Sequence, residues 1–226
     1  MKNSTRGAVD PFIVMDVMEA ARQAEAAGRH IIHMEVGQPA TPAPLGARNA
    51  LRDSLNATEM GYTVALGLPE LRAKIADLYG EWYDVDLDSN RVIVTSGSSA
   101  GFLLSFTSLF DAGERVGIGA PGYPSYRQIL KALDLTAVNI PTSAANKFQP
   151  HPTDLADLSL NGLLVASPSN PTGTMLSRGE LGALIEASER SEAAFISDEI
   201  YHGIEYETKA VSALEITNNC YVRNSF

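Results

Sequence analysis

Short apolar runs recur along the second half of the chain, and they predict buried strands. The runs span residues 91–95, 115–119, 135–140, 162–167, 193–197 and 220–222. They lack alternating polar residues, which is typical of strands buried on both faces of a sheet. Stretches with helical spacing fall between several of these runs, at 99–110, 124–133 and 178–190. The alternation predicts an α/β fold: a three-layer, mostly parallel open sheet with helices on both faces and right-handed crossovers.

The part of the chain before the first run is predicted to be mainly helical. Residues 10–30 begin with Asp-Pro and carry apolar residues at roughly helical spacing, which predicts a capped amphipathic helix. Residues 31–46 form a short extended piece and then a proline-rich loop that cannot be helical. Two further helices are predicted, at about 44–57 and at 69–83.

The change of character near residue 45 predicts a domain boundary. We expect an N-terminal helix and arm over residues 1–45 and a larger domain over residues 46–226.

The composition is that of a globular protein and narrows the range of partners. Asp and Glu outnumber Lys and Arg by 27 to 17, which gives a formal net charge of -10, and no basic cluster is present. Nucleic acid and anionic membrane surfaces are therefore not expected partners. Cys220 is the only cysteine, so neither an intrachain disulfide nor a cysteine-based metal site is expected. The N-terminus has no apolar signal region and no apolar run could span a membrane, so we expect a cytoplasmic location.

Polar and aromatic residues gather where the predicted strands end. The segments that follow five of the strands read SGSSAG, APGYPSY, PSNPTG, DEIYHG and RNSF. In an open α/β sheet the ligand site lies outside the carboxyl ends of the strands. These five segments are therefore expected to meet at one edge and to form the site.

The first of these segments, at residues 96–101, has two interpretations. Ser98 or Ser99 can cap the helix that follows. Alternatively, the glycine-rich turn, the hydroxyls and the backbone N–H groups of the helix N-terminus form a cradle for a phosphate. The segment matches neither the dinucleotide-binding nor the nucleoside triphosphate-binding glycine pattern.

The other segments contain side chains suited to a flat, charged ring. Tyr123 lies in a turn bounded by Pro and Gly, where it either covers the sheet edge or offers a face for stacking. Asn170 precedes a proline in a tight loop, which by itself is common turn chemistry. Asp198 ends an apolar strand, where a carboxylate must be solvated or paired and can hold a cationic ring nitrogen. Tyr201 shares this site if the segment turns helical. None of the four histidines has ligand spacing, so no metal site is expected.

Taken in order, the motifs resemble those of one enzyme family. The segments that match are VGQP, GYTVALGLPELR, SGSSAG, PGYPSY, SNPTG and SDEIY, and the match covers nearly the whole chain. They are similar to the class I/II aminotransferases of fold type I, which use pyridoxal 5'-phosphate (PLP). The resemblance implies the large PLP-binding domain of that fold. It also implies transfer of an amino group between an amino acid and a 2-oxo acid by a ping-pong mechanism.

The resemblance implies a role for each matching residue. Gly97, Ser98 and Ser99 would bind the cofactor phosphate, and Tyr123 would stack on the pyridine ring. Asp198 would pair with the protonated ring nitrogen, so that the ring remains an electron sink. In the same way, Asn170 and Tyr201 would hydrogen-bond the phenolic oxygen of the ring.

Further matches extend the implied site to substrate and partner subunit. Ser225 matches the first serine of the family's S-x-S-K segment and would help to bind the phosphate. Gly37 would lie on the lid near the substrate, which Asn170 would also contact. Tyr62 would reach the phosphate bound by the neighbouring subunit, which implies a homodimer.

The resemblance also indicates what this stretch of chain does not contain. If Ser225 begins the S-x-S-K segment, the Schiff-base lysine belongs two residues beyond Phe226. Lys209 lies in a polar segment before the wrong strand and is not expected to replace it. We therefore expect the chain alone to be inactive. Three alternatives stay open: a PLP-dependent C–S β-lyase, a non-catalytic PLP-binding or assembly module, and a sensor domain of a regulator. The last would need a DNA-binding domain, which this sequence does not contain.

Overall fold

The structure, a computed structural model, describes residues 2, 4–37, 41–57 and 61–226. It divides into two compact units, one of residues 1–10 with 66–226 and one of residues 11–65. The predicted domain boundary after residue 45 falls inside the second unit and stays a prediction.

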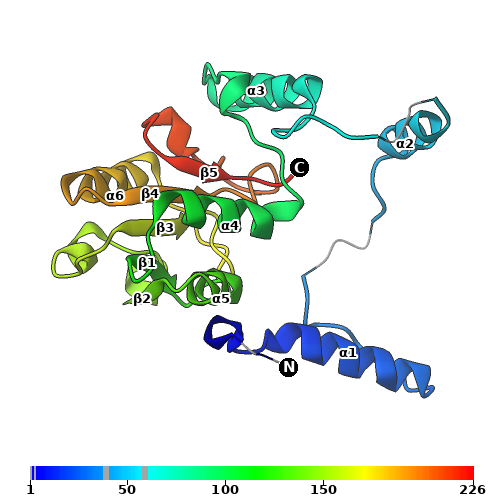
Figure 1. The fold of residues 1–226 in the computed structure, drawn as a ribbon, viewed down its shortest axis with the longest axis horizontal. Coiled ribbons are helices and arrows are strands. Elements are labelled where there is room, and N and C mark those ends of the chain that lie inside the picture. Colours follow the sequence, from blue (N-terminus) through cyan, green and yellow to red (C-terminus); the bar gives the residue numbers. More distant parts are fainter. Residues whose placement is uncertain (1, 3, 38–40, 58–60) are drawn as a thin grey trace. The chain divides into compact units, whose positions relative to one another are not determined.

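A five-stranded parallel sheet organises the larger unit (Figure 1). Its strands are β1 (Arg115–Ala120), β2 (Thr136–Pro141), β3 (Gly162–Ala166), β4 (Ala194–Asp198) and β5 (Tyr221–Arg223). Their order is β2-β1-β3-β4-β5, and each neighbouring pair is parallel. The register places Ala166, Asp198 and Arg223 side by side at the carboxyl ends of β3, β4 and β5. The predicted parallel α/β sheet is confirmed, and the carboxyl ends of its strands lie along one edge.

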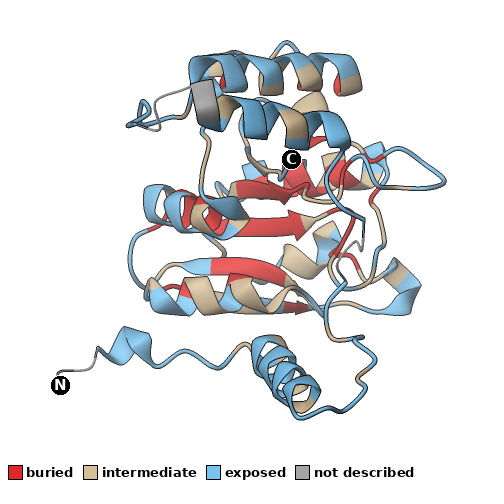
Figure 2. Ribbon diagram, turned by 90° about the vertical axis from the view of Figure 1, so that its right-hand side faces the viewer, coloured by how far each residue is buried: buried red, intermediate tan, exposed pale blue. Residues whose placement is uncertain are grey.

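Helices cover both faces of this sheet because successive strand residues point to opposite sides. On one face, α4 (Gly97–Leu109) and α5 (Pro124–Ala132) pack against Leu164 and Ile196. On the other face, α6 (Arg178–Arg190) packs against Leu163 and Phe195. Figure 2 shows the buried residues concentrated on the strands between these helices. The predicted three-layer arrangement is confirmed.

The predicted strand at residues 91–95 is wrong. Residues Ser89–Arg91 form a 3-10 helix, η2, and Val92 is extended but belongs to no strand. A strand requires a neighbour that continues its backbone ladder. Among the described residues, a single backbone hydrogen bond joins residues 91–95 to a distant part of the chain. It runs from the Val94 N–H to the Leu66 carbonyl and is 2.9 Å long.

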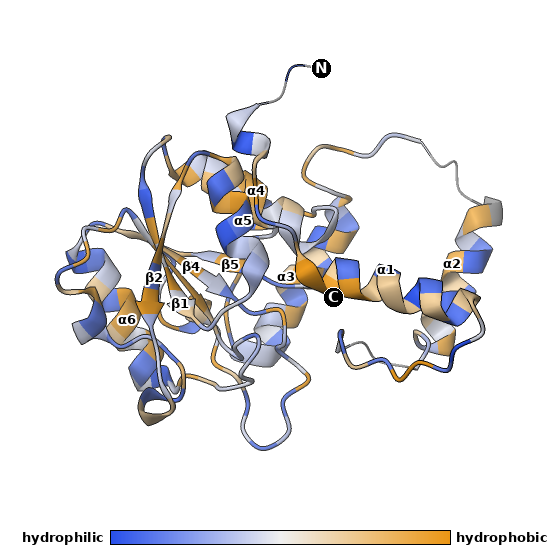
Figure 3. Ribbon diagram, turned by 90° about the horizontal axis from the view of Figure 1, so that it is seen from below, coloured by the Kyte–Doolittle hydropathy of each residue, from blue (hydrophilic) through white to orange (hydrophobic). Residues whose placement is uncertain are grey.

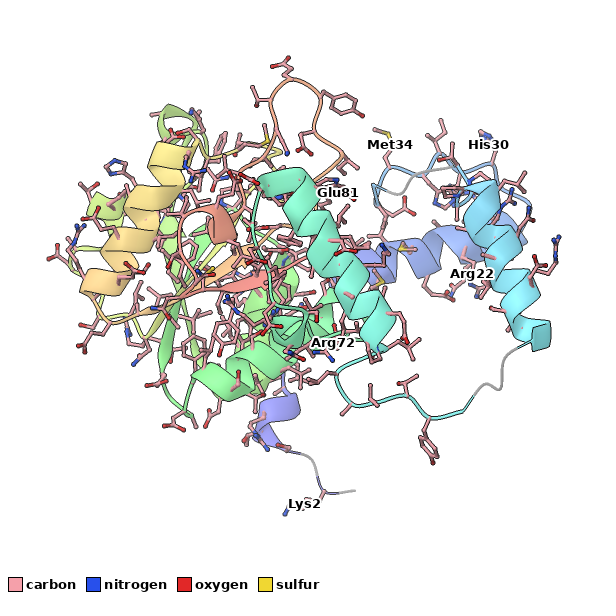
Figure 4. The ribbon with its side chains drawn as sticks, turned by 90° about the horizontal axis from the view of Figure 1, so that it is seen from above. Lys2, Arg22, His30, Met34, Arg72 and Glu81 are labelled. Carbon is pink, nitrogen blue, oxygen red and sulfur yellow. The ribbon has the colours of Figure 1, made fainter. Side chains whose placement is uncertain are left out.

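Helix α3 (Pro69–Tyr83) is joined to this segment by a buried arginine. Arg72, labelled in Figure 4, donates to the carbonyl of Val92 at 2.9 Å and to that of Ser89 at 2.8 Å. Its guanidinium therefore satisfies carbonyls that no strand partner reaches. Four further 3-10 helices are η1 (Thr5–Gly7), η3 (Ala144–Asn146), η4 (Pro152–Leu155) and η5 (Ala213–Glu215).

The second unit contains two of the predicted helices, α1 (Ile13–Ala26) and α2 (Leu45–Ala57). The predicted cap of α1 is wrong: Phe12 occupies the N-cap position, and no side-chain cap bond is formed there. Several apolar side chains of α1 are largely exposed within the described structure, and Figure 3 shows hydrophobic and hydrophilic residues mixed along this helix. None of the described helices combines the length and apolarity needed to cross a membrane.

Candidate functional site

Asp198 lies at the carboxyl end of β4 and is almost completely buried, with 3% of its surface exposed. The Tyr126 hydroxyl donates a hydrogen bond to Asp198 Oδ2, and the Ile200 N–H donates to Oδ1 at 3.3 Å. Burial raises the pKa of this carboxyl group, and the two hydrogen bonds oppose the rise. A nearby cationic group would stabilise the carboxylate in this position.

Asn170 and Tyr201 come from different loops and form a direct contact. Asn170 follows β3, Tyr201 follows β4, and Asn170 Nδ2 donates to the Tyr201 hydroxyl oxygen at 3.0 Å. Burial raises the pKa of Tyr201, and the Asp198 carboxylate adds to the rise. Because its oxygen accepts the Asn170 bond, Tyr201 still has its own proton to donate.

Tyr123 occupies the N-cap position of α5, at the carboxyl end of β1. Its ring lies edge to face with the ring of Tyr126, with centroids 5.3 Å apart and an interplanar angle of 80°. Tyr126 and Asn170 line the same recess, together with Gly119, Gln149 and Ala166. The aromatic turn, the asparagine loop and the carboxylate therefore meet at the predicted edge.

The segment Gly97–Ser99 forms the first turn of α4. Gly97 has a positive φ of 79°, a conformation that favours glycine. Ser96 occupies the N-cap position, and its side chain makes no cap bond to the described residues. Ser98 and Ser99 lie inside the first turn, so the alternative prediction that one of them is the cap is wrong. The uncapped N–H groups and two hydroxyls of this turn are suited to bind an anion.

The end of β5 lies beside α4 and the end of β4. A Cβ on Gly101 of α4 would approach Arg223 Cδ to 3.1 Å, and the Glu199 N–H donates to the Arg223 carbonyl at 2.7 Å. Asn224 Nδ2 donates to the Tyr79 hydroxyl at 3.2 Å. Ser225 is exposed, and its N–H donates to Asn224 Oδ1 at 2.8 Å.

Glu199 was not predicted as a site residue from the sequence, and it lies at the centre of a buried polar network. It is fully buried and accepts bonds from Ser197 Oγ at 3.0 Å, Ser212 Oγ at 2.9 Å and the Ala213 N–H at 2.8 Å. The Tyr79 hydroxyl also donates to it, at 3.4 Å. The network therefore joins α3, β4, η5 and, through Asn224, the end of β5.

His202 belongs to the same buried region. Its Nε2 lies 2.9 Å from the Ser167 carbonyl, to which it must donate, and its Nδ1 lies 2.6 Å from the Tyr83 hydroxyl. The imidazole therefore supports the loop after β3. Among the described residues, no group of three or more His, Cys, Asp and Glu side chains is arranged to hold a metal ion.

Three further residues singled out from the sequence are Lys209, Gly37 and Tyr62. Lys209 Nζ donates to the Trp82 carbonyl and lies 5.0 Å from the centroid of the Tyr83 ring, at the end of α3. Gly37 and Tyr62 belong to the unit of residues 11–65, where both are exposed. Their roles toward a lid and a neighbouring subunit stay predictions.

Comparison with known proteins identifies the family. The family model described as "Aminotransferase class I and II" matches residues 29–226, which is most of the chain. The chain belongs to the class I and II aminotransferases. The aminotransferase resemblance of its sequence motifs is thereby confirmed.

Individual aminotransferases are similar over almost all of this chain. The valine–pyruvate aminotransferase of Mycobacterium tuberculosis is 42% identical over 225 residues, which cover 98% of this chain and 58% of that protein. A solved structure of a putative aminotransferase from Silicibacter pomeroyi is 66% identical, with a TM-score of 0.91, and the match covers all of this chain and 58% of that one. An aminotransferase structure from Mycobacterium tuberculosis is 41% identical with a TM-score of 0.95, and covers 100% and 59% of the two chains. The chain thus spans somewhat more than half the length of these aminotransferases.

Proposed function

We propose that this chain forms the greater part of the PLP-binding domain of an aminotransferase that moves an amino group between an amino acid and a 2-oxo acid. The observation that carries this proposal is the buried Asp198 carboxylate, placed at the edge where Tyr123, Asn170 and Tyr201 also meet. Family membership supports the reaction type, while the chain's partial coverage of its relatives leaves the activity of the whole protein a proposal.

The residues present fit PLP on chemical grounds. Burial destabilises the Asp198 carboxylate, and a pyridinium N–H would supply both the opposite charge and a hydrogen-bond donor. The uncapped first turn of α4, with Ser98 and Ser99, offers donors for the phosphate. Tyr123 offers an aromatic face for the ring.

In this mechanism the chain's own residues hold and polarise the cofactor. When bound, PLP supplies an electron sink for the amino acid after its Cα proton leaves. Asp198 would keep the ring nitrogen protonated, which maintains that sink. The Tyr201 O–H and the second Nδ2 hydrogen of Asn170 are left to donate to the phenolic oxygen of the ring, because the bond between the two residues uses neither. Ser225 would add a donor at the phosphate.

A substitution at Asp198 tests the proposal in the full-length gene product that carries this chain. In Asp198→Asn, which keeps the shape and removes the charge, we expect PLP affinity to fall and kcat/KM for transamination to drop by about 100-fold or more. Asp157→Asn, at an exposed position, is the matched control and should behave as the wild type. Full transaminase activity in Asp198→Asn would refute the assignment of the ring-nitrogen partner.

Product analysis separates the aminotransferase from a PLP-dependent C–S β-lyase. We expect a new amino acid to form only when an acceptor 2-oxo acid is present. Ammonia and pyruvate released without an acceptor would support the lyase instead. The related enzymes carry names for valine–pyruvate and for aspartate transamination, so a panel of amino-acid donors is needed.

Oligomeric state and cellular location complete the proposal. We infer a homodimer in which Tyr62 reaches the phosphate of the neighbouring subunit, supported by its complete exposure within its own unit. Light scattering on the full-length protein tests this, and a stable monomer with bound PLP would contradict it. The cytoplasmic location stays a prediction from the sequence.

A further inference from the structure

Tyr126 lies between the two parts of the site that would hold the cofactor ring. It is buried, with 4% of its surface exposed, in the first turn of α5. Its hydroxyl donates to Asp198 Oδ2. Among the described residues it is the one side chain that donates a hydrogen bond to this carboxylate, because the other donor is the backbone N–H of Ile200.

The ring of Tyr126 contacts two other aromatic rings. It meets the Tyr123 ring edge to face, with centroids 5.3 Å apart and an interplanar angle of 80°. It also meets the ring of Phe102 in α4, with centroids 5.1 Å apart and an interplanar angle of 67°. Edge-to-face pairs at these distances are stabilising and fix ring orientation. The Tyr123 ring therefore packs against the Tyr126 ring, whose own orientation is fixed by Phe102 in the core.

We propose that Tyr126 is a positioning residue of the cofactor site, whose hydroxyl fixes the Asp198 carboxylate and whose ring supports the ring of Tyr123. This inference rests on the proposed PLP site and assigns it a residue outside the cofactor contacts. One side chain thereby sets both the partner of the ring nitrogen and the surface on which the ring stacks.

The charges around the carboxylate explain why this hydroxyl matters. Burial raises the pKa of Asp198, while the Tyr126 hydroxyl, the Ile200 N–H and the charges of Arg223 and His202 lower it. The pKa of Tyr126 is raised by burial and by the Asp198 carboxylate, so its hydroxyl remains a donor at any working pH. Without the Tyr126 hydroxyl, the pKa of Asp198 would rise further. The Asp198 carboxylate would then take the proton from the pyridine nitrogen of PLP more readily.

A series of variants in the full-length gene product separates the hydroxyl from the ring. The readout is the dissociation constant of PLP, measured by reconstituting the apoprotein and following absorbance. For Tyr126→Phe, which removes only the hydroxyl, we expect affinity to fall about 10-fold, and for Tyr126→Leu, which also removes the ring, about 100-fold. Tyr83→Phe is the matched control, because Tyr83 is also buried and its hydroxyl meets His202 rather than Asp198. We expect this control to stay within about twofold of the wild type.

Two further measurements distinguish positioning from general support of the core. In an Asp198→Ala background, Tyr126→Phe should change PLP affinity less than about twofold, because the hydroxyl acts through the carboxylate. With PLP labelled with ¹⁵N in the ring, the Tyr126→Phe signal should move toward that of unprotonated pyridine. A purely structural role of Tyr126 would leave this shift unchanged.

The possible failures are distinguishable. A wild-type protein that binds no PLP overturns the proposed function and this inference with it. A wild-type protein that binds PLP, with Tyr126→Phe equal to it in affinity and in ¹⁵N shift, overturns this inference alone. An equal loss of affinity from Tyr126→Phe with and without Asp198 also overturns it.

Discussion

Removal of the Glu199 carboxylate is expected to destabilise the fold strongly. This side chain is fully buried, and three of the groups that donate to it, Ser197 Oγ, Ser212 Oγ and the Ala213 N–H, belong to residues with 3% exposure or less. Glu199→Ala removes their acceptor and leaves a cavity between α3 and η5.

The magnitude follows from the number of donors left without an acceptor. Breaking a buried polar network of this kind costs about 3–5 kcal/mol, and each buried donor left unsatisfied accounts for about 1–3 kcal/mol of it. Total stability of a domain is only about 5–15 kcal/mol, so Glu199→Ala should remove a large fraction of it. Glu199→Gln keeps one carbonyl oxygen and the shape, and we expect a loss of about 1–2 kcal/mol.

Urea unfolding followed by circular dichroism measures these losses. At an m value of about 2–3 kcal/mol/M, Glu199→Ala should lower the midpoint by about 1–2 M. Glu207→Ala, at an exposed position, is the control and should not shift the midpoint measurably. A Glu199→Ala midpoint equal to that of the control would refute the conclusion that this network stabilises the fold.

The same group predicts a dependence of stability on pH. Burial raises the pKa of Glu199 above its usual value of 4.5, so the folded state binds this proton more tightly than the unfolded state. The contribution of this proton to the free energy of unfolding is therefore fully present below pH 4.5, and it is lost as pH rises through the pKa of Glu199 in the folded state. The fall in the free energy of unfolding with rising pH that Glu199 causes should disappear in Glu199→Gln. The fall that Asp198 causes should remain, because the pKa of Asp198 is also raised.

Three shorter predictions concern packing, reactivity and the excluded lysine. Gly162→Ala should destabilise the fold by about 2–3 kcal/mol, because the new Cβ would lie 2.3 Å from Phe110 Cζ; Gly179→Ala, which meets nothing within 4 Å, is the control, and equal urea midpoints would contradict the packing. The partly buried Cys220 thiol, whose pKa is raised to about 12 by desolvation, should react with a disulfide reagent at pH 8 about 100-fold or more slowly than in urea-unfolded protein, and similar rates would contradict the raised pKa. Lys209→Met should leave PLP affinity within about twofold of the wild type, whereas loss of binding would assign Lys209 to the site.

The fold was predictable to the extent that each element carries its own signal. The strands at 115–120 and 194–198, for example, are apolar runs bounded by polar residues, and both occur where they were predicted. Residues 91–95 carry the same apolar signal and form no strand, because strand formation depends on a neighbour and not on composition alone.

The site was predictable where a residue belongs to a motif. Asp198, Asn170 and Tyr201 were expected at one edge, and the structure brings them there. Tyr126 was not predicted as a site residue, although it follows Tyr123 by three residues, a spacing that places both on one side of a helical turn. Its bond to Asp198 crosses 72 residues of sequence and has no local signal.

The sequence by itself determined the α/β architecture, the order of the polar segments at the strand ends and the family, because these depend on local periodicity and on motifs. Only the tertiary structure decided that Glu199 is buried, that Tyr126 contacts Asp198 and that Ser98 and Ser99 lie within a helical turn rather than at its cap. The reason is physical: burial, hydrogen-bond partners and pKa shifts depend on which distant segments pack together. Those contacts are formed between elements, and the sequence of one element does not specify its neighbours.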